Sequence, residues 1–467
     1  MATSCTRVCQ ELSFRFGLAL HFPKDDIDWS IWDEKQREVT PACRVEPSST
    51  ADVSEILELL TTHWCRFAVK GGGHAQAVDA SNSVGGVTID LHRMDRVDIS
   101  QDRTRANLGP GLVLGEAYSA LEPYNLTFVG GRVADVGVPG FTLGGGISNL
   151  SPQYGLALDN VFEYEVVLPN ASIVTASEGH NPDLYFALRG GGNNFGIVTN
   201  FLVRLVPQGA LWSGESIYDS EYTATVIERV HELSTTLSED TYMCFSSRYA
   251  YNQTANEYTI GVMQAYYEPI DFPAVFEQLN SIPHRSSTLR VDRMSRFAAD
   301  AISPHGSRRL YATLTFEASA ILHSRILQIF QEEVERVKSV QGFRPSVVTQ
   351  ALHVNAIKAM RQRGGNSLGV ESAGPLNFVL LTFGWSNAED DEAMSDFADA
   401  WVSRSTEAAT ELGILNPWIY INYAKENQDP FSGYGENKHR LRRIQRQIDP
   451  RGVFTSMGLC RGSFKLL

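Results

Sequence analysis

The hexapeptide Val69-Lys70-Gly71-Gly72-Gly73-His74 joins the end of a short apolar run to three consecutive glycines and a histidine. The run RFAV at residues 66–69 is typical of a β-strand. Because glycine has no Cβ atom, successive main-chain N–H groups after such a strand can turn toward one anion. This stretch therefore predicts a strand followed by a phosphate-binding loop.

Two more glycine clusters follow the first. They are LGGGIS at residues 143–148 and RGGGNNFGI at residues 189–197. A single cluster is typical of an ordinary tight turn, but three in one region favour a binding site built from main chain. The two familiar nucleotide motifs do not fit. G-x-x-x-x-G-K-[ST] is absent, and GPGLVLG at residues 109–115 misses the third glycine of G-x-G-x-x-G by one residue.

The length of the chain, 467 residues, predicts at least two domains, because a single core stops growing at roughly 250 to 300 residues. Residues 1–207 contain short β-branched runs between glycine pairs, with a helical pattern at residues 51–63, and we expect an α+β cofactor domain there. In residues 208–410, strands precede long amphipathic helices, which indicates an antiparallel sheet covered by helices on one face. The glycine-rich stretch 361–369 predicts a loop.

The final segment, residues 411–467, is too short for an independent domain. Its basic run at residues 438–446 could be mistaken for a nucleic-acid patch. Leu441, Ile444 and Ile448 lie at helical spacing within and just after the run, so we interpret the charges as the solvated face of a docked helix.

The charge and the composition of the chain exclude some classes of binding partner. The formal net charge is -14, which argues against nucleic acid and anionic membranes as the main partner and favours a neutral or cationic small molecule as substrate. No run approaches the ~18 apolar residues of a membrane span, and the N-terminus lacks the continuous apolar stretch of a secretion signal. We therefore expect a cytoplasmic protein. The six cysteines show no metal-ligand spacing, which predicts free thiols and no metal site.

Four ordered stretches carry a resemblance to a known family. They are residues 71–91, 136–177, 183–201, and the closing YINYAKEN and YGENKHRLRRIQRQIDPRGVF at residues 420–427 and 434–454. They resemble FAD-linked oxidases of the vanillyl-alcohol-oxidase (PCMH) type with a berberine-bridge-enzyme-like C-terminal segment. The resemblance implies a two-domain, α+β FAD-binding fold, with the C-terminal segment returning to the FAD domain.

The resemblance also implies how FAD is held. The first glycine loop would bind the pyrophosphate, and His74 would bond to the 8α-methyl carbon of the flavin. Many relatives add a second bond through the cysteine of a Cys-Pro-Thr-Val-Gly pattern. Residues 133–137 are Val-Ala-Asp-Val-Gly here, so a single covalent link is expected. The implied cofactor residues are Lys70, Gly71, Gly72, Gly73, His74, Ala75, Gly137, Pro139, Gly140, Leu143, Gly144, Gly145, Ile147, Ser148, Gly196, Ile197, Asn422 and Asn437.

Tyr420 and Tyr423 are the candidates for the catalytic base. Oxidation of an alcohol or amine delivers hydride to the flavin and commonly needs a group that takes a proton. In a strand, Tyr420 and Asn422 would share one face and Tyr423 the other, and both tyrosines stay candidates. Plant-type members carry a tyrosine where this chain has Ile147, so a role of that tyrosine does not transfer.

Three functions are compatible with these observations. The first is an oxidase of a small, secondary-metabolite-like molecule, in which O2 reoxidises the flavin. The second is a dehydrogenase that uses another electron acceptor. The third is a non-redox cyclase or binding protein built on a flavin scaffold.

Overall fold

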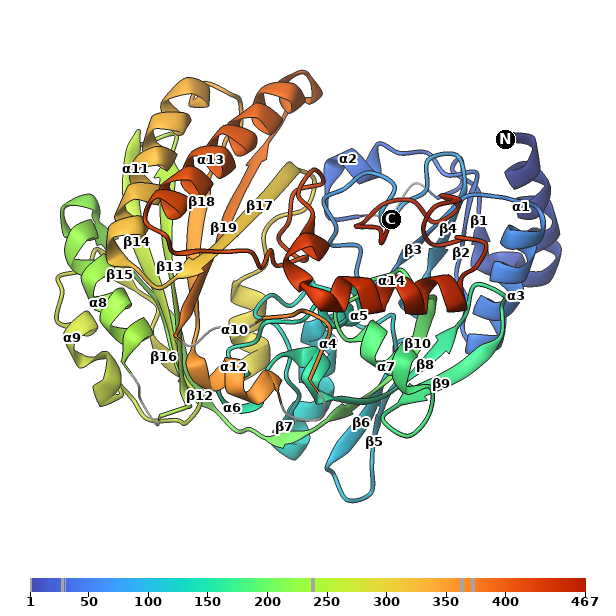
Figure 1. Cartoon of the computed structure of the whole chain (residues 1–467), viewed down its shortest axis with the longest axis horizontal. Coiled ribbons are helices and arrows are strands. Elements are labelled where there is room, and N and C mark those ends of the chain that lie inside the picture. The colour runs from blue at the N-terminus through green and yellow to red at the C-terminus, as the bar shows by residue number, and fades with distance from the viewer. Residues whose placement is uncertain (1, 27–28, 30, 237–239, 362–364, 371–373) are drawn as a thin grey trace.

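The computed structural model describes residues 2–26, 29, 31–236, 240–361, 365–370 and 374–467. The chain folds into two lobes (Figure 1). One lobe holds two sheets from the first part of the chain, and the other holds one large sheet. The glycine-rich stretch 361–369 predicted as a loop includes residues 362–364, which lie outside the described residues.

The first sheet of the cofactor lobe has the strand order β1 (Leu20–His21), β2 (Cys43–Val45), β4 (Val87–Asp90) and β3 (Phe67–Lys70), in which β2, β4 and β3 are parallel. The helix α3 (Thr50–Thr62) begins at Ser49, which forms a capping box with Asp52. Its apolar stripe, which includes Ile56 and Leu60, is fully buried. The crossover between parallel strands therefore supplies the apolar cover of this sheet.

The second sheet has the order β5 (Val97–Ile99), β6 (Arg105–Leu108), β10 (Ile197–Arg204), β8 (Val161–Val167) and β9 (Ile173–Ser177), all antiparallel. The helices of this part are α4 (Leu114–Leu121), α5 (Val138–Leu143), α6 (Ser151–Tyr154) and α7 (Pro182–Leu188). The short strands β7 (Leu126–Thr127) and β11 (Val206–Pro207) pair with each other. The chain then enters the second lobe.

The large sheet runs in the order β15, β12, β14, β13, β18, β19, β17, β20, with β16 paired to β12, and every pair is antiparallel. The strands are β12 (Leu211–Asp219), β13 (Met243–Asn252), β14 (Glu257–Tyr266), β15 (Ser286–Ser287), β16 (Arg290–Asp292), β17 (Arg308–Glu317), β18 (Ser346–Leu352), β19 (Leu376–Trp385) and β20 (Leu415–Asn416).

Helices cover the outer face of this sheet (Figure 1). They are α8 (Thr223–Thr235), α11 (Ala320–Val337) and α13 (Asp391–Glu411). The shorter helices of this lobe are α9 (Glu277–Asn280), α10 (Met294–Asp300) and α12 (Val354–Met360). The predicted α+β class, with an antiparallel sheet covered by helices on one face, is confirmed.

Alternation along the strands assigns their side chains to two faces. In β18, Val347 packs in the core beneath the helices, whereas Ser346, Val348 and Gln350 line a cavity on the other face. In β17, Leu310 belongs to the same core, and Arg309 and Tyr311 line the cavity. The large sheet therefore turns one face toward the cofactor lobe.

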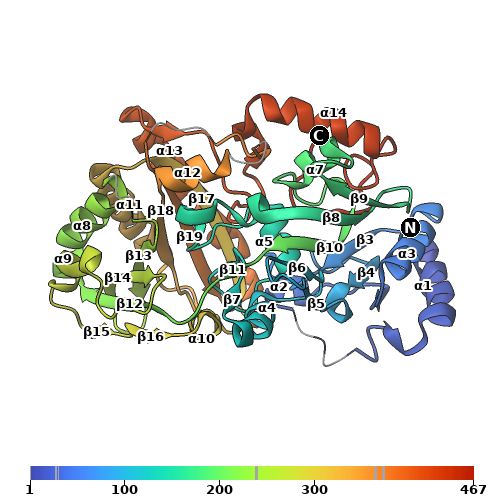
Figure 2. The same ribbon diagram turned by 90° about the horizontal axis from the view of Figure 1, so that it is seen from below.

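The C-terminal segment returns to the cofactor lobe, where α14 (Glu436–Ile448) lies beside α7 (Figure 2). Leu441 and Ile444 are buried, while Arg440 pairs with Asp183 at 2.8 Å. The interpretation of the basic run as the solvated face of a docked helix is confirmed. Among the described residues, no helix combines the length and the apolar character needed to cross a membrane.

The expectation of six free thiols is wrong. Cys5 and Cys9 lie four residues apart on α1 (Ala2–Phe16) and form disulfides with Cys65 and Cys43, while Cys244 and Cys460 are free. The spacing along the chain could not show these pairs because folding brings α1 against distant strand ends. The cytoplasmic location stays a prediction, and the two disulfides favour an oxidising compartment instead.

Candidate cofactor and substrate site

The first glycine loop follows β3 and lies against the segment that precedes α5. A Cβ atom on Gly72 would lie 2.4 Å from the main-chain nitrogen of Gly137, and one on Gly71 would lie 2.5 Å from Cγ of Pro139. Gly73 has a φ of +72°, which favours glycine. These three glycines therefore let two loops pack at a distance that any side chain would prevent.

The main-chain N–H groups of this loop are available to a ligand. Within the part of the chain that the structure describes, no hydrogen bond engages the N–H groups of Gly71, Gly72 or Gly73. Partly buried N–H groups normally have acceptors. The loop fits the pyrophosphate of FAD because successive N–H groups can bind its oxygens. The Lys70 ammonium, by contrast, already pairs with Asp90 at 3.1 Å.

The His74 side chain is held between an indole and a carboxylate. Its ring stacks on Trp32 with centroids 3.8 Å apart, and its Nε2 lies 3.7 Å from Oδ1 of Asp135. Burial lowers the pKa of His74 to about 4, although the charge of Asp135 opposes the shift. The imidazole is therefore neutral near pH 7 and keeps a lone pair for bond formation.

Asp135 has one oxygen free for this imidazole. Its Oδ2 accepts a hydrogen bond from His305 at 3.0 Å. Its Oδ1 is buried and has no hydrogen-bond partner among the described residues. An unpartnered buried carboxylate oxygen beside a histidine is suited to receive a proton from that ring.

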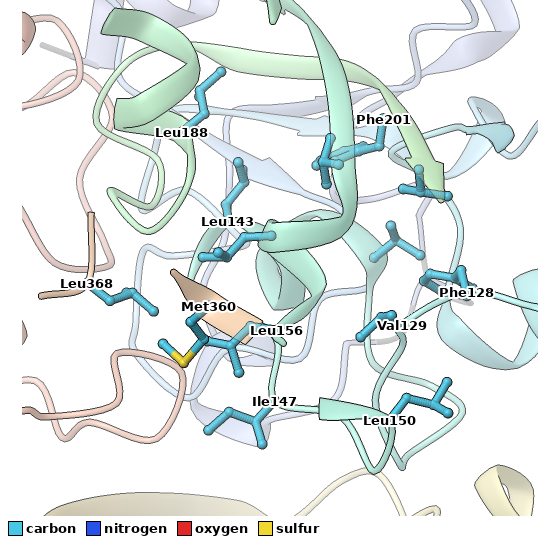
Figure 3. Close-up of a cluster of buried hydrophobic side chains, with 14 of the residues drawn as sticks. Phe128, Val129, Leu143, Ile147, Leu150, Leu156, Leu188, Phe201, Met360 and Leu368 are labelled. Atoms are coloured by element: carbon cyan, nitrogen blue, oxygen red, sulfur yellow. The ribbon is translucent and has the colours of Figure 1, made fainter. Parts of the chain in front are cut away.

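The second glycine cluster is fixed by the Tyr420 hydroxyl. The Tyr420 oxygen accepts hydrogen bonds from the N–H groups of Gly146 at 3.2 Å and Ile147 at 3.1 Å, and from Nδ2 of Asn422 at 3.0 Å. Leu143 and Ile147, at the two sides of the glycines, belong to a buried cluster that also contains Met360 of α12 and Leu368 (Figure 3). Packing and hydrogen bonds together hold this loop.

Residues 420–423 form a turn and not the expected strand. The N–H of Tyr423 donates to the carbonyl of Tyr420 at 2.9 Å, and the two rings meet edge to face at 4.8 Å. The prediction of opposite faces for the two tyrosines is therefore wrong, because the turn brings both rings to one side of the chain. Asn422, between them, also donates to the carbonyl of Phe141 at 3.0 Å.

The two tyrosines nonetheless differ in surroundings. Tyr420 is 2% exposed, and burial raises its pKa well above the ordinary value. Tyr423 lines a cavity, where its hydroxyl oxygen accepts hydrogen bonds from Nη2 of Arg132 at 2.9 Å and from Nε2 of Gln350 at 3.4 Å. Of the two candidate bases, Tyr423 lines the cavity and Tyr420 does not.

The cavity lies between the large sheet and the cofactor lobe and has a volume of about 830 Å³. This volume is within the range of small-molecule sites. Its walls include residues of β12, β13, β14, β16, β17, β18 and β19 of the sheet, of α10, and residues 131–133 of the cofactor lobe.

Comparisons with known proteins place these features in a family. The model of an FAD-binding domain matches residues 41–177, and that of the berberine and berberine-like segment matches residues 419–457. The chain is 35% identical to the FAD-dependent monooxygenase tpcD of Cochliobolus heterostrophus over 97% of this chain and 93% of that protein. The chain belongs to this family of FAD-linked oxidoreductases.

Solved structures share the fold of this FAD-linked oxidoreductase. The 6-hydroxy-D-nicotine oxidase of Arthrobacter nicotinovorans superposes with a TM-score of 0.80 at 20% identity, over 93% of this chain and 96% of that one. The glucooligosaccharide oxidase of Acremonium strictum, whose FAD is described as 6-S-cysteinyl and 8α-N1-histidyl, superposes with a TM-score of 0.78 at 19% identity, over 99% of each chain. The predicted FAD-binding fold is confirmed.

The remaining residues predicted to bind FAD in this oxidoreductase have varied surroundings. The Ala75 carbonyl accepts a hydrogen bond from Gln36, and the Ser148 hydroxyl accepts one from the N–H of Leu150 at 3.1 Å. A Cβ atom on Gly144 would lie 2.0 Å from Oδ1 of Asn422, and one on Gly196 would lie 2.5 Å from the carbonyl of Val167.

Several of these residues lie in packed or open parts of the lobe. Ile197 begins β10 and is buried, a Cβ atom on Gly145 would lie 3.1 Å from the ring of Tyr420, and Gly140 has open space around its Cα. Asn437 lies in the first turn of α14 and does not line the cavity. The roles of all these residues toward FAD stay predictions.

Sequence reasoning missed Arg132, Gln350, Asp135 and Trp32. Asp135 lies within residues 133–137, but the resemblance assigns no role to that position. Alternation within β18 could have shown that Gln350 shares a face with Ser346 and Val348. No local signal could show that this face meets the cofactor lobe.

Proposed function

We propose that this protein is an FAD-linked oxidase that carries FAD covalently on His74, oxidises a small organic molecule in the 830 Å³ cavity and returns the electrons to O2. The observation that carries the proposal is the Tyr423 hydroxyl, which lies on the cavity wall and is oriented by Arg132 and Gln350. Bound FAD supplies the acceptor for a hydride from the substrate.

His74 has the properties that attachment requires. Its imidazole is kept neutral by burial, and Oδ1 of Asp135 is placed to take the proton that the ring loses. With FAD bound, a bond from the imidazole nitrogen to the 8-methyl carbon would replace one C–H and one N–H bond. The electron pair released would pass to O2, which would leave with the two protons as hydrogen peroxide.

A single covalent link is part of this proposal. Val133 stands where the resemblance places the cysteine of doubly linked relatives, and valine has no nucleophilic atom. Of the described cysteines, Cys244 is a free thiol on the large sheet, and burial raises its pKa to about 11. A thiol with that pKa is a poor nucleophile near pH 7.

Tyr423 is the proposed base. An alcohol or amine that gives up hydride must also lose a proton, and the Tyr423 oxygen is an acceptor in the cavity wall that Arg132 and Gln350 orient. Arg132 donates to that oxygen, so its positive charge offsets negative charge that forms there. Tyr420 is a positioning residue, because its oxygen is enclosed by Gly146, Ile147 and Asn422.

The names of similar proteins support the use of O2. The relative from Cochliobolus heterostrophus is named a monooxygenase, and the structures from Arthrobacter and Acremonium are oxidases. These classes share O2 as a reactant. A dehydrogenase with another acceptor and a non-redox cyclase are the alternatives that an experiment must separate.

The test uses the purified protein with its own flavin. The flavin is reduced with dithionite without air and then mixed with air-saturated buffer, and we expect rapid reoxidation with one hydrogen peroxide per flavin. Reduced flavin that persists in air but reacts with a dye acceptor would show a dehydrogenase. Substrate conversion that continues with the flavin kept reduced would show a non-redox enzyme.

A further inference from the structure

The wall of the cavity carries more positive than negative charge. Five arginines line it, against the carboxylates of Glu215 and Asp300; the arginines are Arg132, Arg248, Arg290, Arg309 and Arg344. This contrasts with a formal net charge of -14 for the whole chain. An excess of cationic groups around a cavity raises the local concentration of anions.

Two of these arginines are neutralised within the protein. Arg248 forms two hydrogen bonds with the carboxylate of Glu215, at 3.0 and 2.9 Å. Arg290 pairs with Asp292 at 3.1 Å and with Asp300 at 2.7 Å. These two guanidinium groups therefore have little charge left for a ligand.

The other three have no carboxylate partner. Within the described ranges, the ion pairs of the wall arginines are those of Arg248 and Arg290, and none involves Arg132, Arg309 or Arg344. The charges of Asp33 and Asp135 still act on Arg309 from a greater distance. The Arg309 guanidinium lies over the Trp32 ring at 4.6 Å and donates to the carbonyl of Pro304. Arg344 is exposed, whereas Arg132 and Arg309 are partly buried, and a partly buried cation without a counter-ion is costly unless a ligand supplies one.

Arg132 is the one beside the proposed base. Among the described residues its guanidinium donates one hydrogen bond, to the Tyr423 oxygen at 2.9 Å, and a guanidinium has five N–H donors. Close by, Oε1 of Gln350 is buried and has no hydrogen-bond partner in the described part of the chain. Unused donors and acceptors thus converge at one end of the cavity.

Apolar and aromatic side chains make up another part of the wall, beside several hydroxyl groups. The apolar and aromatic residues include Met263, Phe297, Val348, Leu380 and Phe383. Such a wall binds rings and alkyl groups through burial of apolar area.

We propose that the substrate is an organic anion, an apolar ring-bearing molecule whose carboxylate or phenolate oxygen binds Arg132. This inference rests on the proposed function, because it places the anion beside Tyr423. The guanidinium would bind the oxyanion through its unused N–H groups. The group next to the anion would then lie within reach of the Tyr423 oxygen, and Gln350 would accept from a neighbouring hydroxyl of the substrate.

The test measures binding and not turnover. Isothermal titration of the flavin-containing protein compares 2-naphthoate with the neutral 2-naphthamide, and 4-nitrophenolate tests the phenolate form. We expect one or both anions to bind, the amide to bind at least tenfold more weakly than naphthoate, and Arg132→Met to weaken anion binding by at least tenfold. Which anion binds more tightly separates carboxylate from phenolate substrates.

A control variant and a substitute variant accompany this binding test. Arg96, on the surface with 80% of its side chain exposed and paired with Asp98, gives the control Arg96→Gln, which should bind the anions like the wild type. If Arg132→Met does not fold, Arg132→Gln replaces it. Equal binding of naphthoate and naphthamide, no binding of either anion, or unchanged anion binding after removal of Arg132 would overturn the inference.

The inference and the proposed function can fail separately. A protein that holds covalent FAD and makes hydrogen peroxide, yet binds no anion, refutes only the substrate class. A protein that binds naphthoate through Arg132 but whose reduced flavin does not react with O2 refutes only the oxidase.

Discussion

The cofactor loops and the substrate cavity use different parts of the polypeptide for binding. At the loops, main-chain N–H groups are presented by Gly71, Gly72 and Gly73, and the packing of Gly72 against Gly137 leaves no room for side chains. At the cavity, the binding groups are side chains such as Arg132, Gln350 and Tyr423, which are far apart in the chain. The glycine loop can bind a ligand because it has no side chains in the way, whereas the cavity binds its ligand through particular side chains.

The largest effect is expected when one methyl group is added to the glycine loop. In Gly72→Ala the new Cβ atom would lie 2.4 Å from the main-chain nitrogen of Gly137, so the two loops must separate. We expect nearly complete loss of bound flavin, measured by the visible absorbance of the purified protein. Gly209→Ala is the control, since Gly209 has open space around its Cα. Normal flavin content in Gly72→Ala would refute the account of the loop.

A second change acts on the cavity alone. Tyr423→Phe removes the proposed proton acceptor, and we expect turnover to fall by about 100- to 10,000-fold with flavin content unchanged. The assay follows hydrogen peroxide with a substrate found by screening aromatic acids. Turnover within a factor of three of the wild type would remove Tyr423 from the mechanism.

Tyr420→Phe is the variant to compare with Tyr423→Phe, because it removes the same hydroxyl group from the neighbouring tyrosine. Tyr420→Phe leaves the N–H groups of Gly146 and Ile147 without their acceptor, so we expect a loss of about 1–3 kcal/mol in the free energy of unfolding. Chemical denaturation measures this loss. If Tyr420→Phe is as stable as the wild type but has lost turnover as Tyr423→Phe should, the roles of the two tyrosines are reversed.

The smallest expected effect concerns pH. Burial lowers the pKa of His74 to about 4, so the ring stays neutral as the pH falls from about 7 to about 5.5. An ordinary histidine would be mostly protonated at the lower pH, and its neutral fraction would fall about tenfold. We therefore expect the rate of covalent FAD attachment to the flavin-free protein to change by less than about twofold. A tenfold fall would show an exposed, ordinary imidazole.

Much of the cofactor lobe could be predicted from the sequence because its signals are local. Glycine clusters, the strand before Gly71 and the apolar stripe of the helix at residues 51–63 are each contained in a few consecutive residues. The docking of the basic C-terminal helix through Leu441 and Ile444 followed from helical spacing in the same way.

The rest could not be predicted because it depends on contacts between distant residues. Arg132 and Tyr423 are 291 positions apart, and Cys5 and Cys65 are 60 apart. Composition and periodicity do not show which distant residues meet in the fold. The turn at residues 420–423 is a different case, because its hydrogen bond from Tyr423 to Tyr420 is local, but the pattern of those residues was equally compatible with a strand.

Acid precipitation of the purified wild type and of His74→Ala, followed by visible spectra of pellet and supernatant, tests the central claim most directly. That claim is that main-chain N–H groups hold FAD while His74 tethers it. The account predicts a yellow wild-type pellet, and free flavin in the supernatant of His74→Ala, with His439→Ala behaving like the wild type. A folded wild type that is colourless and has no affinity for added FAD, or a yellow pellet from His74→Ala, would contradict it.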